Sequence, residues 1–511
     1  MLEPNTEAGI CSICDASIPV GAGHEMLFAL ICSDCHSRGL EPGIMDSVYA
    51  IEMALKKKGE TLKWYQSADA RWMSQCDNAL LAIPPGGGKS CTSLVSIKGN
   101  PPIVVICPKV AKGVWKREAL RWRGWRPGSE YFEVSGKDGF NRWPKPGELY
   151  AVNFEILPSP KDMRPYPGTI VIVDEVHRIK NPDNKCTQRA RALIAQAVYG
   201  GGKAYGLSGT PMLNRPDELF EVLESLGLGK STFGSLKYFR TLFQARRGRY
   251  GVWQYGNPLP EFYDRVKKVM LVRKREDVMK GLPPLTIEDI PVTVDDKTLK
   301  VCDEAMAELA KAGLTLEDFV DAASRADEAV AVSTSGARKL VFEKIAAARA
   351  ALAEAKLPYL IELVRDLEED EEPTLVFSAH LTAADIIGQR EGWGSITGGS
   401  GDRTDVENKF QAGELKGVVG TIQAAGVAIT LTRATHVVFL DLCWTPALNE
   451  QSMYRAHRLG TDHPVIVKRL MSNHALDIRV ATLLDRKARL IDKTINGAAL
   501  GDGEAHPDLA D

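Results

Sequence analysis

Several features are scarce in this chain of 511 residues, and each absence narrows its class. No run of about 20 consecutive apolar residues occurs, which excludes a typical membrane-spanning helix. The N-terminal stretch MLEPNTEAGICSIC has neither a basic start nor an apolar core, so we do not expect a secretory signal. The net charge is only −2 and provides no overall attraction to nucleic acid. Binding of nucleic acid would therefore require a local groove.

Cysteine is also sparse, with ten residues, of which four cluster near the N-terminus. This usage indicates a reducing compartment rather than a disulfide scaffold, and we expect a cytoplasmic location in a bacterial or phage-related setting rather than a nuclear one. The hydrophobic content of 44% and the charged content of 25% are typical of a globular protein. The length predicts two or three domains.

Apolar runs typical of buried strands alternate with helical segments in two parts of the chain. The first part has runs at 79–83, 102–107, 148–152, 169–173 and 204–208, and the second has runs at 374–379, 417–421, 436–441 and 465–470. This alternation predicts an α/β fold class with two parallel-sheet lobes. The predicted division is a zinc module at 1–45, lobe 1 at 46–228, a helical insertion and linker at 229–350, lobe 2 at 351–497 and a disordered tail at 498–511.

The stretch LAIPPGGGKSC at 81–91 has the composition of a phosphate-binding loop between a strand and a helix. Gly86, Gly87 and Gly88 allow backbone N–H groups to turn toward a phosphate, next to the positive end of the helix. Lys89 would neutralise the β and γ phosphates of ATP, and Ser90 would ligate Mg²⁺. The usual first glycine of the pattern is replaced by isoleucine, so a glycine-rich turn before a helix remains the alternative.

Two adjacent carboxylates end the apolar run in VIVDEVHRIKN at 171–181. Asp174 at the tip of the strand can hold Mg²⁺ through water, and Glu175 can take a proton from an attacking water. A solvated Asp-Glu pair at a strand end is the alternative. Together with the phosphate loop upstream, the pair predicts nucleotide hydrolysis.

Four N-terminal cysteines form two CxxC pairs separated by 17 residues. The spacing of Cys11, Cys14, Cys32 and Cys35 suits one tetrahedral Zn²⁺. Metal binding would supply folding energy to a module with little core. A pair of disulfides or unrelated thiols are the alternatives, and the pattern does not say whether such a ribbon contacts DNA or protein.

Further motifs carry a resemblance to a known family. DEVHRIKN resembles the DEAH-type box of superfamily 2 helicases, and LSGTPMLNRPDELF at 207–220 resembles the third motif in its Swi/Snf form. TIQAAGVAITLTRATHVVF at 421–439 and WTPALNEQSMYRAHRLG at 444–460 resemble the last two helicase motifs. The resemblance runs from about 60 to 495. The strings IQAAG, HVVF and RKARLIDKTING are similar to the annealing-helicase (HARP-like) branch.

This resemblance implies two RecA-like lobes and a role for each matching residue. Gln66 would read the adenine edge, Gly426 would contribute to the nucleotide site, and Ser208 with Thr210 would couple hydrolysis to lobe movement. Arg455 and Arg458 would act as arginine fingers from the second lobe. We expect both on one helix, where their spacing of three places them on nearly one face, so that both could reach a γ-phosphate.

Contacts with DNA are predicted at a few positions. The segment 109–126 holds seven basic residues and three tryptophans, and the segment 236–253 adds five basic residues. The basic residues can meet phosphates, whereas the tryptophans either stack on bases or fill a core. Individual candidates are Lys109, Asn153, Lys180 and Trp444. A solvated basic surface is the alternative for both segments.

Together, these motifs predict a DNA-dependent ATPase that uses ATP, Mg²⁺ and Zn²⁺ and moves on double-stranded DNA. Fork remodelling and strand annealing are two activities that such movement could drive. We expect a monomer whose partner is double-stranded or forked DNA. One alternative is a strand-separating superfamily 2 helicase on DNA or RNA. Another is a zinc-ribbon adaptor with a vestigial ATPase, against which the intact catalytic residues argue.

Overall fold

The computed structural model describes residues 61–498 apart from 124–127, 137–139, 141, 248–252, 321–336, 399–402 and 426–428. It also describes the backbone of four short strands near the N-terminus. These form two antiparallel pairs, β1 (Gly9–Ile10) with β2 (Ser17–Ile18) and β3 (Gly23–Met26) with β4 (Ala29–Cys32). Cys11, Cys14, Cys35, Gly426 and the tail from 499 lie outside the described residues, and for Cys32 only the backbone is described. The zinc site therefore stays a prediction.

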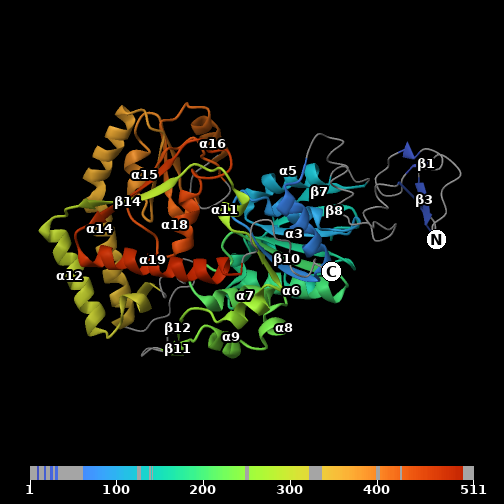
Figure 1. The fold of residues 1–511 in the computed structure, drawn as a ribbon. Helices are drawn as coiled ribbons and strands as arrows, with labels where there is room; N and C mark the ends of the chain where they lie inside the picture. Colours follow the sequence, from blue (N-terminus) through green and yellow to red (C-terminus); the bar gives the residue numbers. More distant parts are fainter. Residues whose placement is uncertain are drawn as a thin grey trace.

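A seven-stranded parallel sheet forms lobe 1, coloured blue to green in Figure 1. Its strand order is β13 (Met270–Val272), β5 (Asn78–Ala82), β10 (Lys203–Ser208), β9 (Ile170–Asp174), β6 (Ile103–Cys107), β8 (Glu148–Asn153) and β7 (Glu130–Glu133). One face is covered by α3 (Trp64–Gln75), α4 (Lys89–Val95) and α5 (Lys112–Trp122), and the other by helices that include α6 (Lys185–Tyr199) and α7 (Pro216–Ser225). Burial on both faces explains the unbroken apolar runs of its central strands.

Lobe 2 is a six-stranded parallel sheet. Its order is β14 (Leu285–Val292), β19 (Val465–Ser472), β18 (His436–Phe439), β15 (Thr374–Ser378), β17 (Gly417–Thr421) and β16 (Trp393–Ile396). Its helices include α15 (Thr382–Ile387), α16 (Arg403–Gln411) and α18 (Pro446–Met453). Every strand predicted from an apolar run is present, and the two-lobe α/β fold class is confirmed.

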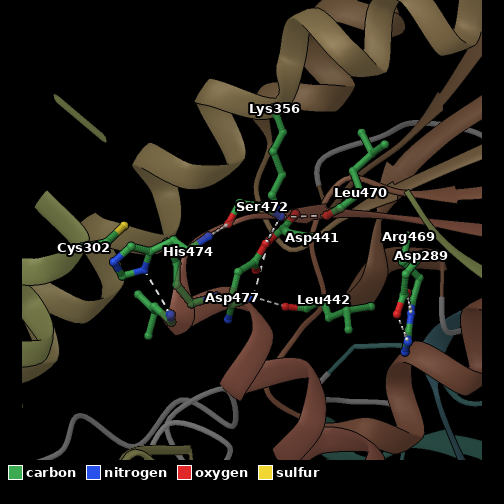
Figure 2. A network of polar contacts seen from close by, with 12 residues as sticks. Asp289, Cys302, Lys356, Asp441, Leu442, Arg469, Leu470, Ser472, His474 and Asp477 are labelled. Atoms are coloured by element: carbon green, nitrogen blue, oxygen red, sulfur yellow. Dashed lines mark hydrogen bonds and ion pairs between the residues drawn. The ribbon is translucent and has the colours of Figure 1, made fainter. Parts of the chain in front are cut away.

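The predicted insertion at 229–350 is not one structural unit. The helices α8 (Gly229–Phe233), α9 (Leu236–Leu242) and α10 (Pro260–Val266) contribute to the core of lobe 1, and β13 joins its sheet. Strand β14 and the helices α12 (Asp296–Lys311) and α14 (Ala337–Glu369) belong with lobe 2. Figure 2 shows Lys356 of α14 fastened to lobe 2, where it donates to Leu470 O at 2.8 Å and pairs with Asp477. The predicted boundary at residue 228 is therefore wrong, because β13 is too short and β14 too polar to stand out as apolar runs.

The last of the described helices, α19 (Ala475–Asn496), connects the two lobes. Figure 1 shows it running from the α12–α14 side of lobe 2 to lobe 1. Val480 and Leu484 pack with α12 and α14, whereas Ile491 and Ile495 enter the core of lobe 1. The packing of one helix against both lobes constrains how they move.

In the described part of the chain, none of the helices has the length and apolar character that a membrane span requires.

Candidate active site between the two lobes

The loop between β5 and α4 depends on its glycines. Gly86 and Gly88 both have a φ of 84°, in the left-handed region that favours glycine. A Cβ on Gly88 would lie 2.2 Å from Gln66 Nε2, and a Cβ on Gly87 would lie 2.3 Å from Ile83 Cγ2. The Ile83 side chain thus occupies the space beside Gly87. This packing shows how the loop accommodates isoleucine where the usual pattern has glycine.

Lys89, the first residue of α4, holds the loop together through its ammonium group. Its Nζ donates to Ile83 O at 2.9 Å and to Pro84 O at 3.4 Å. Burial lowers the pKa of Lys89, and the nearby Glu175 and Asp174 carboxylates oppose that shift. A lysine at the start of a helix, beside turned backbone N–H groups, favours an anion. The loop can therefore receive phosphates if Lys89 exchanges its carbonyl acceptors for phosphate oxygens.

The acidic pair lies at the carboxyl end of β9, next to this loop. Trp115 Nε1 donates to Asp174 Oδ2 at 2.8 Å, which fixes the carboxylate and leaves Trp115 buried in the core. Glu175 has a φ of 50°, which is uncommon for a residue with a side chain. Its Oε2 is buried without a hydrogen-bond partner in the described residues. A strained residue that presents an unpaired carboxylate oxygen fits the predicted role of taking a proton from an attacking water.

Burial and the adjacent Glu175 carboxylate raise the pKa of Asp174 to about 6. Burial lowers the pKa of the neighbouring His177 to about 3, so its imidazole is neutral near pH 7. His177 Nδ1 lies 3.4 Å from Glu175 Oε2, but without a positive charge it does not neutralise that carboxylate. Two close carboxylates supply the oxygen ligands that Mg²⁺ prefers, in agreement with the predicted metal, and the Lys89 ammonium is a cation already near them.

A path of hydrogen bonds leads from the acidic box to lobe 2. His177 Nδ1 and Ser208 Oγ are 3.0 Å apart, and Ser208 Oγ accepts from Thr210 N at 3.0 Å. Thr210 Oγ1 in turn accepts from Gln451 Nε2, on α18 of lobe 2, at 2.8 Å. Ser208 and Thr210 thus lie on a continuous path of hydrogen bonds between the acidic box and lobe 2. His177 and Gln451 both lie within motifs that carry the family resemblance, but neither was among the predicted site residues.

The predicted arginine fingers do not lie on a helix. α18 ends at Met453, so Arg455 and Arg458 occupy the turn that follows it. Their side chains still converge, since Nη1 of Arg455 and Nη1 of Arg458 donate to Ile429 O at 3.2 Å and 3.1 Å. The prediction of a shared helix face is wrong, but the prediction of neighbouring guanidinium groups is consistent with this geometry.

Arg458 reaches the phosphate loop of lobe 1. Its Nη2 lies 3.6 Å from the position that a Cβ on Gly86 would take. Burial and the neighbouring Arg458 lower the pKa of Arg455 to about 10, and the Glu175 carboxylate opposes that shift. The structure thus brings cations of lobe 2 next to the glycines and acids of lobe 1.

Of the four residues predicted to contact DNA, one is exposed and the other three make contacts within the protein. Lys109 is exposed just beyond β6, where a phosphate can reach it. Lys180 is buried, and its Nζ donates to Glu218 Oε1 at 3.0 Å, so the structure assigns it a structural ion pair instead of a DNA contact. Asn153 is buried and its amide donates to Glu155 at 2.6 Å. Trp444 lies against Phe319 and under the Arg349 guanidinium, which favours packing over base stacking.

Two family models match most of the chain. The SNF2-related domain matches residues 65–318 and the Helicase conserved C-terminal domain matches residues 355–460. The first range covers lobe 1 and extends into β14 and α12 of lobe 2, whereas the second runs from within α14 to just beyond α18. Together they include the phosphate loop, the acidic box and both arginines.

Individual relatives are distant. The DNA annealing helicase and endonuclease ZRANB3 of Mus musculus is 27% identical and aligns with 78% of this chain and 37% of its own length. The SWI/SNF-related matrix-associated actin-dependent regulator of chromatin subfamily A-like protein 1 of Xenopus tropicalis is 25% identical, over 85% of this chain and 45% of its own. The Sulfolobus solfataricus SWI2/SNF2 ATPase core in complex with dsDNA is 18% identical, with a TM-score of 0.37, over 86% of this chain and 94% of that one. The chain spans less than half the length of these two curated relatives.

Proposed function

The chain belongs to the Swi/Snf-type ATPases of helicase superfamily 2, and on this premise we propose that it couples ATP hydrolysis to movement along double-stranded DNA. One observation carries the proposal: Arg458 of lobe 2 reaches the phosphate loop of lobe 1. A site divided in this way is complete only when the lobes close. Each cycle of closure and opening can therefore shift the lobes along a bound strand.

Lobe 1 would hold the nucleotide and its metal. Gln66 lies against the loop and would read the adenine edge, while Lys89 would bind the β and γ phosphates. Ser90 and Asp174 would hold Mg²⁺, which when bound neutralises phosphate charge. The unpaired Oε2 of Glu175 would accept a hydrogen bond from the attacking water and take up its proton.

Lobe 2 would supply charge stabilisation. Arg455 and Arg458 would stabilise the negative charge that builds on the γ-phosphoryl group during transfer. The Gln451–Thr210 hydrogen bond would form when the lobes close, and it would connect lobe 2 to the acidic box through Ser208 and His177. Lobe movement and hydrolysis would thereby depend on one another.

The proposed partner is double-stranded or forked DNA. Relatives named as a DNA annealing helicase and as a SWI/SNF-related regulator of chromatin support this choice. Movement along a duplex uses backbone phosphates, which carry no sequence information. We expect ATPase stimulation that is nearly independent of DNA sequence and that weakens steeply with salt.

The test compares ATPase rates with duplex, single-stranded and forked DNA, followed by two strand assays. A translocase should displace the third strand of a triplex in an ATP-dependent manner without unwinding a tailed duplex. Unwinding without triplex displacement would instead support a strand-separating helicase. The absence of DNA-stimulated ATPase activity would support the adaptor alternative.

The proposed zinc site is supported by the backbone of the N-terminal strands. β1 leads directly into the pair Cys11 and Cys14, β4 ends at Cys32, just before Cys35, and β1 lies beside β4. Metal analysis of protein kept reduced and free of chelators should find about one zinc per chain. Zinc content that persists after Cys11→Ser and Cys32→Ser replacement would contradict the assignment.

A further inference from the structure

The segment that begins with α11 (Arg275–Val278) connects the two sheets and contacts the phosphate loop. Met279 and Val278 pack with Tyr65 in a small buried cluster. Tyr65 Oη donates to Gly87 O at 2.9 Å, and Met279 Cε lies 3.5 Å from the position of a Cβ on Gly86. One side of this segment is thus fixed to the loop that would hold phosphates.

The other side of the segment grips the turn that carries the two arginines. The Arg275 guanidinium lies 3.9 Å from the centroid of the Tyr454 ring. Its Nη2 is hydrogen-bonded to His457 O and lies 3.0 Å from His457 Nδ1. His457 Nε2 is 2.7 Å from Pro283 O, so this imidazole can donate at Nε2 and accept at Nδ1. Tyr454 and His457 flank Arg455, and His457 directly precedes Arg458.

The contact is not arranged for maximal stability. Arg275 Nη1 is buried and has no hydrogen-bond acceptor among the residues that the structure describes. A buried, unpaired donor on a charged group costs free energy of folding. Arg275 also lines a cavity of about 110 Å³ with Thr210 and Gln451, which are hydrogen-bonded to each other across the two lobes. Its position therefore favours a functional role over a purely structural one.

We propose that Arg275 is a positioning residue that sets the arginine fingers against the phosphate loop by holding Tyr454 and His457. This inference rests on the proposed ATPase function. A planar guanidinium can stack on a ring while it donates to neighbouring acceptors, whereas the ammonium of lysine can donate but has no planar face to stack. The same short segment contacts the phosphate loop, so the distance between loop and fingers is set locally.

The test measures steady-state ATPase activity of Arg275→Ala, Arg275→Lys and the matched control Lys274→Ala with saturating duplex DNA. Lys274 is exposed and adjacent to Arg275, so its variant removes one positive charge without changing the contacts of Arg275 with Tyr454 and His457. Misplaced catalytic groups commonly cost about 10²-fold in rate. We expect kcat to fall roughly 10- to 100-fold in both Arg275 variants, with nucleotide affinity and the thermal midpoint nearly unchanged. Equal losses in affinity and kcat, or normal kcat, would overturn the proposal.

A double-mutant cycle separates positioning from general destabilisation. If Arg275 acts only through the fingers, adding Arg275→Ala to Arg458→Ala should cause little further loss, because the positioned group is already absent. Losses that multiply would contradict the inference while leaving the ATPase proposal intact. If the unaltered protein has no DNA-stimulated turnover, it is the proposed function that fails.

Discussion

The two lobes contribute to the active site in different ways. In lobe 1, Asp174 and Ser208 are the last residues of neighbouring parallel strands, and Lys89 begins the helix after a third. In lobe 2, Arg455 and Arg458 lie on a turn beyond a helix, where both donate to the carbonyl of Ile429 and Arg458 also donates to the Thr430 side chain. The site of lobe 1 is thus built into its sheet, whereas that of lobe 2 depends on contacts made from elsewhere in the chain. Changes in lobe 1 should therefore abolish ATP hydrolysis, whereas changes in lobe 2 should lower kcat by a smaller factor.

The largest effect is expected in lobe 1. Lys89→Ala or Glu175→Gln should lower ATP turnover by as much as roughly 10⁴-fold, because phosphate neutralisation or the general base is lost. Phosphate release assays measure the loss, and a thermal midpoint close to that of the unaltered protein is the control for folding. Near-normal turnover in folded Lys89→Ala would refute the assignment of the loop.

A smaller loss, which is selective for kcat, is expected in lobe 2. Arg458→Ala should reduce kcat by roughly 10²-fold while nucleotide affinity changes much less, because the arginine acts mainly in the transition state. Fluorescent-nucleotide binding and steady-state kinetics on the same preparation separate the two quantities. Parallel losses in both would show Arg458 to be an ordinary contact in the ground state.

The buried acids of lobe 1 predict a pH dependence. The pKa of Asp174 is raised to about 6, so this acid becomes protonated as the pH falls through that value. Asp174 would hold Mg²⁺ only in its deprotonated form. Turnover at limiting Mg²⁺ should therefore fall about tenfold per pH unit below the pKa of Asp174. Higher Mg²⁺ should move the inflection to lower pH, since metal and proton compete. An inflection that does not respond to Mg²⁺ would exclude Asp174 as its source.

The smallest effects on turnover are expected at Lys180 and Lys109, for which the sequence predicts contacts with DNA. Lys180→Ala would remove the ion-pair partner of the buried Glu218, whose Oε2 would still accept from Leu213 N and Asn214 N. The change should lower the free energy of unfolding by about 3 kcal/mol, measured by chemical denaturation. Lys109→Ala should leave stability unchanged and reduce the salt dependence of DNA binding by about one phosphate contact. If Lys180→Ala instead left stability unchanged and reduced the salt dependence of DNA binding, Lys180 would be a DNA contact.

Much of the fold follows from local patterns along the chain. The strands β5, β6, β9 and β10 are buried on both faces, so their sequences are unbroken apolar runs and were predicted. The strands β13 and β14 were missed because the first has three residues and the second is an edge strand with exposed charges. Pairing with a distant strand, and not local composition, determines that they are strands.

The sequence by itself determined which chemical groups are available and where parallel strands would present them. A glycine-rich turn before a helix and a carboxylate at a strand end follow from backbone geometry over a few residues. The tertiary structure alone decided that Lys180 pairs with Glu218, that Thr210 meets Gln451 and that Arg275 grips the turn with the arginines. These contacts join residues 38, 241 and 182 positions apart. No local propensity encodes such separations, because they arise only when sheets, helices and linker pack together.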